Sequence, residues 1–150
     1  MKGLTNDRIT LIHGPPGTGK SETLVALLQI MGKAGLKVLV CAEANNPVDI
    51  LLTKFAKTET FSSDFSRPGK ILRLGHSALI DKNCKQFTMQ SLTRSMVRNQ
   101  GISSKQARKT LIRDAQFVFS TQCSCFRADV LEYFEEPDNQ FDYCIVDEAS

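Results

Sequence analysis

Apolar residues form five short runs along the chain, and segments with helical spacing stand between them. The runs are rich in valine, isoleucine and phenylalanine, residues that are typical of β-strands. They occupy Ile9–Ile12, Lys37–Ala42, Ile71–Leu74, Phe117–Thr121 and Tyr143–Val146. The second run, KVLVCA, has the unbroken apolar character of a strand that is covered on both faces, as strands of parallel sheets are. Because helical segments alternate with the runs, we predict an α/β fold with a mostly parallel sheet flanked by helices.

Four segments between these runs have the polar and apolar spacing of helices. Ser21–Met31 carries an apolar face and is followed by two glycines, which favour a helix end. Asn46-Pro47 predicts an N-cap and a first-turn proline for a helix whose apolar face reaches Phe55. Two further segments, Phe87–Val97 and Ser104–Ile112, are too polar to form a core of their own. We interpret them as a helical insertion on the surface, at about residues 77–113.

The length and apolar content of the chain set the number of domains. It has 150 residues, of which 41% are hydrophobic, and this is enough for one ordinary core but not for two full domains. The longest apolar runs are far shorter than the ~20 residues of a membrane-spanning helix. The N-terminal residues also lack the apolar segment of a signal peptide. We therefore expect one domain, with no signal peptide or membrane span.

Basic residues are concentrated in the middle of the chain. Between Arg67 and Arg113, eleven basic residues stand against a single acid, Asp81. Such a segment attracts a polyanion such as a nucleic-acid backbone, although it is also compatible with an ordinary solvated helix face. The arginines of the two polar helices are our candidate nucleic-acid contacts: Arg94, Arg98, Arg108 and Arg113.

The five cysteines indicate a reducing environment. Their number is odd, and three of them lie in or beside apolar runs, which is typical of reduced thiols in a core. Cys123-x-Cys125 lacks the four ligands that a structural zinc site usually needs. The expected location is therefore cytoplasmic or nuclear.

The strongest motif is the glycine-rich segment at residues 14–21. It reads GPPGTGKS and matches the pattern G-x-x-x-x-G-K-[ST] in full, between a predicted strand and a predicted helix. Glycines allow successive backbone N–H groups to surround phosphates at the N-terminus of a helix. We expect Lys20 to contact the β- and γ-phosphates of ATP and Ser21 to ligate Mg²⁺. The nucleotide-binding set is Gly14, Pro15, Pro16, Gly17, Thr18, Gly19, Lys20, Ser21 and Glu22.

An acidic pair follows the last apolar run. Asp147 stands where a predicted strand delivers its side chain to the carboxyl edge of the sheet, and Glu148 comes next. We expect Asp147 to hold Mg²⁺ and Glu148 to polarise an attacking water. Together with Lys20, these two residues form the predicted catalytic set.

Five segments in order resemble the sequence blocks of superfamily 1B helicases. The resemblance covers nearly the whole chain except the basic segment, in the blocks at residues 14–21, 38–49, 71–76, 117–121 and 141–150. The group contains the nonsense-mediated-decay helicase, senataxin and the immunoglobulin mu-binding protein. The resemblance implies a RecA-like P-loop NTPase domain in which Asn45 and the pair Ser120-Thr121 face a nucleic-acid strand. It also implies a second RecA-like domain, which we expect to be absent from residues 1–150.

Two functions remain open at this point. The first is the ATP-binding lobe of an ATP-dependent helicase that translocates along and unwinds single-stranded RNA or DNA. For hydrolysis such a lobe needs a second RecA-like domain, in cis or in trans, and one lobe alone should hydrolyse ATP slowly. The second is a nucleotide-responsive nucleic-acid-binding module without turnover. A GTPase is disfavoured because the chain has no Asn-Lys-x-Asp element.

Overall fold

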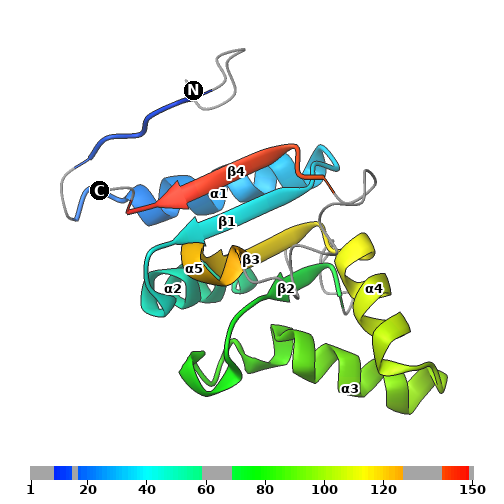
Figure 1. Ribbon diagram of the computed structural model, residues 1–150. Coiled ribbons are helices and arrows are strands. Elements are labelled where there is room, and N and C mark those ends of the chain that lie inside the picture. The colour runs from blue at the N-terminus through cyan, green and yellow to red at the C-terminus, as the bar shows by residue number, and fades with distance from the viewer. Residues whose placement is uncertain (1–8, 15–16, 59–68, 127–139, 149–150) are drawn as a thin grey trace.

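A four-stranded parallel sheet organises the computed structural model, which describes residues 9–14, 17–58, 69–126 and 140–148. The strands are β1 (Val38–Ala42), β2 (Ile71–Arg73), β3 (Phe117–Thr121) and β4 (Tyr143–Asp147). Their order across the sheet is β2-β3-β1-β4, and every neighbouring pair is parallel (Figure 1). The predicted α/β fold with a parallel sheet is therefore confirmed.

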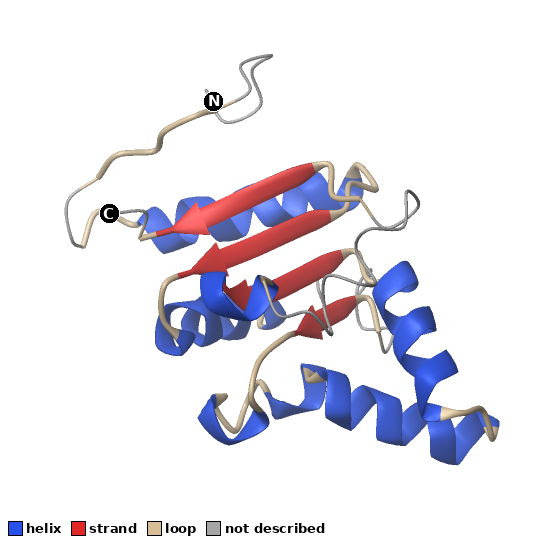
Figure 2. Ribbon diagram, in the orientation of Figure 1, coloured by secondary structure: helices blue, strands red, loops and turns tan. Residues whose placement is uncertain are grey.

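Helices α1 (Lys20–Lys33) and α2 (Asn45–Ala56) cover one face of the sheet. In Figure 2 both lie behind the strands, and the short α5 (Gln122–Cys125) lies on the other side. The core under α1 and α2 is made by alternate residues of the strands, as the period of two in a strand requires. The Phe55 ring, for example, packs edge-on against Phe117 with ring centroids 4.9 Å apart.

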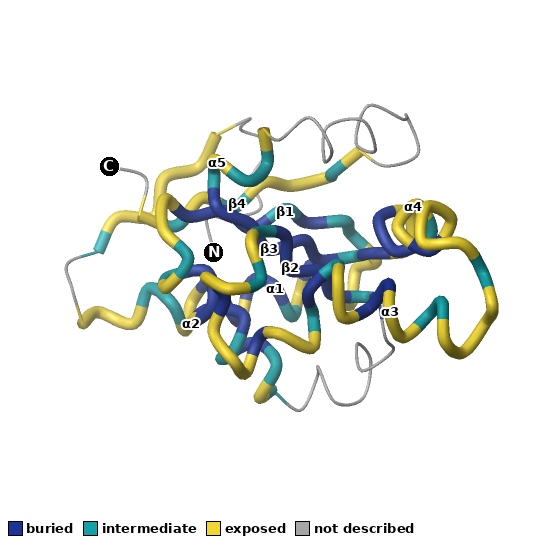
Figure 3. Tube along the Cα trace, turned by 60° about the horizontal axis from the view of Figure 1, so that its bottom comes forward, coloured by how far each residue is buried: buried dark blue, intermediate teal, exposed yellow. Residues whose placement is uncertain are grey.

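The opposite face of β2 and β3 packs against the two basic helices, α3 (Met89–Gln100) and α4 (Ser104–Asp114). Their apolar residues join those of the sheet in a second core cluster: Leu72, Leu74, Leu92, Leu111, Ile112, Ala115 and Val118. The prediction that these helices lie on the surface was therefore incomplete. Each helix is polar on average, but a narrow apolar stripe is enough to seat it on a sheet. Figure 3 shows the exposed turn that joins them.

The first predicted strand was wrong. Ile9–Ile12 is not part of the sheet, and the side chains of Ile9 and Leu11 are exposed at 81% and 87%. An apolar run forms a strand only where a neighbouring strand accepts its backbone hydrogen bonds. Among the described residues, the sheet ends at β4 on one side and at β2 on the other.

Several element boundaries also differ from the predictions. Helix α2 begins at Asn45 with Ala44 as its N-cap, so Asn46 is inside the helix rather than at its cap. Helix α3 begins at Met89 rather than Phe87, because the Thr88 hydroxyl accepts a hydrogen bond from Ser91 N at 3.3 Å and caps the helix there. Two short 3₁₀ turns, η2 (Ser77–Leu79) and η3 (Lys85–Phe87), and helix α5 were not predicted. No helix in the described ranges is long and apolar enough to cross a membrane.

Candidate nucleotide and strand-binding edge

The glycine-rich segment leads directly into α1. Gly17 and Gly19 have φ values of 80° and 85°, in the left-handed region that glycine adopts without strain. Gly19 is the N-cap of α1, and no side chain caps this end of the helix. A Cβ atom added to either glycine would meet nothing within 4 Å, so the space beside them is open. The N-terminus of α1 therefore presents its positive end to an open cradle.

The side chain of Lys20 folds back over this segment. Its ammonium group donates a hydrogen bond to the carbonyl oxygen of Gly14. A Cβ atom on Gly14 would lie 2.7 Å from the Thr18 hydroxyl oxygen and 3.3 Å from Cγ of Lys20, so a larger residue at this position would require these side chains to shift. Ser21 is half-buried in the first turn of α1. Open backbone, a lysine cation and a serine hydroxyl together fit a triphosphate with its cation. Pro15 and Pro16 lie outside the described residues.

The acidic pair ends β4. Asp147 is the last residue of the strand, and Glu148 follows it with a φ of 54°, the only positive φ among the described residues other than glycine. The amide of Glu148 donates to Oδ1 of Asp147 at 3.1 Å, which fixes one oxygen of this carboxylate. The positive φ of Glu148 turns the chain directly after the strand.

Both halves of the predicted nucleotide site lie at one edge of the sheet. Residues 34–37 connect the end of α1 to the start of β1, so α1 runs antiparallel to the strands. Its first residue, Lys20, therefore lies at the carboxyl edge, where β4 ends at Asp147. Figure 1 shows the first turn of α1 on the side of the sheet to which the arrowheads of β1 and β4 point. Parallel α/β sheets bind their ligands at this edge.

The residues that we predict to contact a nucleic-acid strand lie at the same edge of the sheet. Asn45 is the first residue of α2, just after β1, and Thr121 ends β3. Ser120 is fully buried, and its hydroxyl donates to the carbonyl oxygen of Thr121 at 3.0 Å. The Thr121 hydroxyl accepts from the Ser124 amide at 3.3 Å and caps α5. Ser120 and Thr121 therefore shape the backbone at the end of β3, and their hydroxyls are already engaged.

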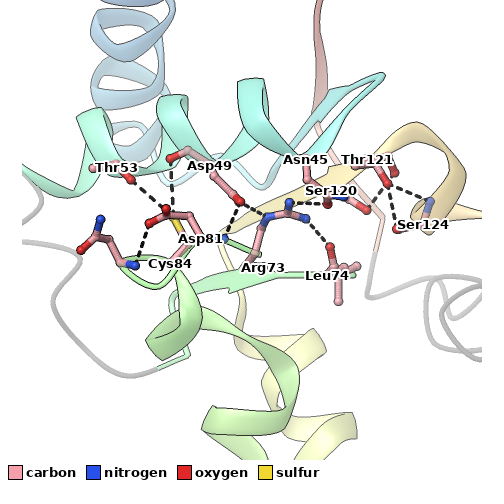
Figure 4. Close-up of polar contacts among 11 residues, drawn as sticks. Asn45, Asp49, Thr53, Arg73, Leu74, Asp81, Cys84, Ser120, Thr121 and Ser124 are labelled. Carbon is pink, nitrogen blue, oxygen red and sulfur yellow. Dashed lines mark hydrogen bonds and ion pairs between the residues drawn. The ribbon is translucent and has the colours of Figure 1, made fainter. Parts of the chain in front are cut away.

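The Asn45 side chain is hydrogen-bonded to a member of a buried ion pair that we did not predict from the sequence. The Arg73 side chain is fully buried, and its Nε donates to Oδ1 of Asp49 at 2.7 Å (Figure 4). Its Nη2 donates to Oδ1 of Asn45 at 2.9 Å, and its Nη1 donates to the carbonyl oxygen of Leu74. Oδ2 of Asp49 accepts from the amide of Asp81 at 2.8 Å. This network joins β2, α2 and the segment after η2. The signal in the sequence was a charged residue inside the apolar run ILRL.

The four basic-helix arginines do not lie on the elements of this edge. Arg94 and Arg98 are exposed on α3, and Arg108 is exposed on α4. Nε of Arg113 donates to Oδ1 of Asp114 at 2.8 Å, and this hydrogen bond raises the pKa of the Arg113 guanidinium. Arg113 thus has an acidic partner beside it.

The thiols of three cysteines interact: Cys41 on β1, Cys125 on α5 and Cys144 on β4. The Sγ atoms of Cys41 and Cys125 are 3.4 Å apart. A hydrogen bond from Cys41 lowers the pKa of the Cys125 thiol to about 6, and a similar bond lowers that of Cys144 to about 7. A thiol has one hydrogen to donate, so these two bonds compete. The short Sγ–Sγ distance favours Cys125 as the acceptor.

Alkylation of Cys125 by iodoacetamide should therefore begin at a lower pH than is usual for a thiol. Its rate should rise through about pH 6, because the thiolate is the reactive form. In Cys41→Ala the donor is lost and the rise should move to higher pH. Peptide mass spectrometry across a pH series measures both, and Cys123 on the same helix reports the activity of the reagent. An unchanged profile in Cys41→Ala would show that Cys41 does not stabilise the thiolate.

The parallel sheet, the glycine-rich segment and the acidic strand end define a P-loop α/β protein. Comparison with protein families matches residues 1–105 to the family described as an AAA domain. The chain belongs to this AAA domain family.

Curated relatives place it further. DNA replication ATP-dependent helicase/nuclease DNA2 of Gallus gallus is 35% identical over 141 residues, which is 94% of this chain and 12% of that protein. The Homo sapiens protein of that name is 34% identical over 149 residues, 99% of this chain and 12% of that protein. DNA-binding protein SMUBP-2 of Mesocricetus auratus is 36% identical over 89 residues, 59% of this chain and 8% of that protein. The resemblance to superfamily 1 helicases is thereby confirmed, and the chain spans about an eighth or less of these relatives.

Proposed function

We propose that this chain is the first RecA-like, ATP-binding lobe of an ATP-dependent nucleic-acid helicase. The observation that carries the proposal is that the glycine-rich cradle at the start of α1 and the acidic end of β4 share the carboxyl edge of one parallel sheet. The relatives named as an ATP-dependent helicase/nuclease support it. The names of these relatives also favour a nuclear or cytoplasmic location.

Different residues of this edge would contact the phosphates, the Mg²⁺ ion and the attacking water. The backbone of residues 14–21 and the ammonium group of Lys20 would bind the phosphates. Ser21 and Asp147 would hold Mg²⁺, which when bound neutralises charge on the β- and γ-phosphate oxygens. Glu148 would orient and polarise the attacking water, because it directly follows Asp147 at the end of β4.

The same edge would guide a single strand of DNA or RNA. Asn45 and the end of β3 at Ser120-Thr121 lie at the carboxyl ends of neighbouring strands. Because ATP and the strand would occupy one edge, closure around ATP can change the strand contacts. In this account a second RecA-like domain completes the hydrolytic site with a charge-stabilising arginine.

Glu148→Gln tests the catalytic assignment. The amide keeps the size of the side chain but cannot accept a proton, so ATP affinity should change little while residual turnover falls by about 10²-fold or more. Single-turnover hydrolysis of radiolabelled ATP, with and without a single-stranded oligonucleotide, measures the effect. Glu43→Gln, a matched change on the exposed glutamate just after β1, should leave turnover unchanged. Equal turnover in Glu148→Gln and the unmodified chain would remove Glu148 from the mechanism.

Turnover in the unmodified chain separates the two functions that the sequence left open. Strand-stimulated hydrolysis supports the motor lobe. ATP binding that changes strand affinity without any hydrolysis, even when a second RecA-like domain is supplied, would instead indicate a nucleotide-responsive binding module.

A further inference from the structure

The thiols of Cys41 and Cys125 face each other although the two residues are far apart in the sequence. Cys41 lies on β1 between Val40 and Ala42, which both belong to the core under α1 and α2. Because successive side chains of a strand point to opposite faces, the Cys41 thiol points to the other face of the sheet. Helix α5 lies on that face (Figure 2) and carries Cys125, whose Sγ is 3.4 Å from Sγ of Cys41.

The two thiols differ in their surroundings. Cys41 is only 5% exposed, and the hydrogen bond that it donates to Cys125, together with burial, raises the pKa of its thiol. Cys125 is half-buried. The same hydrogen bond lowers the pKa of the Cys125 thiol to about 6 against the opposing effect of burial, and the charge of Arg73 also lowers it. At neutral pH, Cys125 is therefore a thiolate and Cys41 a neutral thiol.

This arrangement is typical of cysteines that react reversibly with oxidants, because a partly exposed thiolate stands next to a second thiol that can form a disulfide with it. Both cysteines are free thiols in the structure. A disulfide requires an Sγ–Sγ distance of about 2.05 Å, so the two sulfur atoms must approach by about 1.4 Å. Helix α5 has four residues and none of them is buried, so a small shift of this helix can supply the approach.

We propose that Cys41 and Cys125 form a reversible oxidation site for hydroperoxides, and that the oxidised product is a disulfide between β1 and α5. First, the Cys125 thiolate attacks the terminal oxygen of the hydroperoxide, the O–O bond breaks, and the other oxygen takes up a proton and leaves as an alcohol, or as water when the oxidant is hydrogen peroxide. Cys125 is now a sulfenic acid. Its sulfur then bonds to the sulfur of Cys41, the S–O bond breaks, and the hydroxide leaves as water with the proton of the Cys41 thiol. The two sulfur atoms lose the two electrons that reduce the peroxide, and a thiol reductant reverses the reaction.

Cys144 is the competing partner for Cys41. It is exposed on β4, and a hydrogen bond from Cys41 lowers the pKa of its thiol to about 7. In the register of β1 and β4, however, Cys41 lies opposite Val146, whereas Cys144 lies opposite Leu39, two positions away. The geometry therefore favours Cys125 as the partner of Cys41 in the disulfide.

Peptide mapping of the 150-residue chain after peroxide treatment tests the site. The reduced chain is incubated with hydrogen peroxide at pH 7, its free thiols are blocked, and the monomer is digested without reductant for mass spectrometry. A Cys41–Cys125 cross-link should appear and should be removed by dithiothreitol. Cys123→Ala, a matched change on the exposed cysteine of the same helix, should leave the yield unchanged. A cross-link from Cys41 to Cys144 in its place, or irreversible oxidation of Cys125 without a cross-link, would overturn the proposal.

Cys41→Ala separates the attack on the oxidant from the formation of the disulfide. Without Cys41 the sulfenic acid of Cys125 should accumulate, and dimedone should label it far more than in the parent chain. The labelling is done at alkaline pH, because the variant lacks the hydrogen bond that favours the Cys125 thiolate. Cys125→Ala should slow the oxidation of Cys41 about tenfold or more, because the remaining thiol is buried and neutral. All these chains also carry Cys144→Ala, so that Cys144 cannot replace either thiol. Equal dimedone labelling with and without Cys41 would show that Cys41 does not form the disulfide.

The disulfide would lie beside the residues that we predict to face a nucleic-acid strand, since Asn45 follows β1 and Thr121 caps α5. The consequence for the strand rests on the proposed function. Oxidation should change the affinity for a single-stranded oligonucleotide several-fold, dithiothreitol should restore it, and Cys125→Ala should not respond. A cross-linked chain with unchanged strand affinity would show that the disulfide does not act on these contacts. If the reduced chain binds no strand, the proposed function fails, whereas the peptide mapping still decides whether Cys41 and Cys125 form the oxidation site.

Discussion

Replacing Lys20 by alanine should abolish measurable ATP binding while leaving the fold intact. Lys20 stands at the start of α1, where its ammonium group already lies over the glycine-rich segment and bonds to the Gly14 carbonyl oxygen. The substitution removes charge-assisted hydrogen bonds to two phosphates at once, so the affinity should fall on the order of a hundredfold or more. Alanine is a good helix former, and the helix should be retained. Fluorescence anisotropy with a labelled ATP analogue measures the loss.

Lys33→Ala is the matched control for that experiment. Lys33 is exposed at the other end of the same helix, so its removal changes the net charge equally without touching the cradle. Its ATP affinity should stay within about twofold of the unmodified chain. Unchanged ATP binding in Lys20→Ala, with a normal circular dichroism spectrum, would contradict the assignment of residues 14–21.

Replacing Arg73 by methionine should destabilise the domain more than any surface substitution. Arg73 is fully buried and is the partner of Asp49, whose side chain is only 5% exposed. Removing one member of a buried pair leaves the other charge without compensation, which costs about 3–5 kcal/mol. A domain of this size has a free energy of unfolding of about 5–15 kcal/mol, so the loss is large. Urea unfolding followed by circular dichroism measures it.

The exposed ion pair of this chain provides the comparison. Nζ of Lys54 lies 2.8 Å from Oε1 of Glu22, close to the distance in the buried pair, but these side chains are 40% and 70% exposed. Lys54→Met should therefore cost only about 0–1 kcal/mol. The double variant Arg73→Met/Asp49→Leu should be more stable than Arg73→Met, because no charge remains unpaired. Equal stability losses in Arg73→Met and Lys54→Met would show that burial does not strengthen the Arg73 contact.

The folded variants of Arg73 should also bind a single strand more weakly. Arg73 donates to the side-chain oxygen of Asn45, so its loss frees the amide of Asn45 to turn away from the edge. Arg73 acts through Asn45 in this account and is a positioning residue.

The parts of the fold that could be predicted are those with a local signal. The apolar runs of β1 and β3 identify strands, and the spacing of apolar residues in α1 identifies a helix. In each case the signal lies within the segment itself. The strand end at Asp147 follows from the last apolar run. The glycine-rich segment was predicted from residue types alone, because its pattern describes backbone geometry directly.

The parts that could not be predicted depend on contacts between distant segments. The residues of Ile9–Ile12 do not determine whether this segment pairs with another strand. In the structure it does not pair. The ion pair of Arg73 with Asp49 joins positions 24 residues apart, and neither residue alone indicates the other. The seating of α3 and α4 on β2 and β3 depends on a few apolar residues in helices that are polar on average.

The central claim is that this edge of the sheet binds ATP with Mg²⁺ as part of a nucleic-acid motor. Its most direct test is equilibrium binding of a fluorescent ATP analogue to the 150-residue chain, with and without Mg²⁺ and a single-stranded oligonucleotide. The account predicts saturable binding that requires Mg²⁺, is displaced by unlabelled ATP and changes in affinity when the strand is present. Binding that is not saturable, or that ignores both Mg²⁺ and unlabelled ATP, would contradict it.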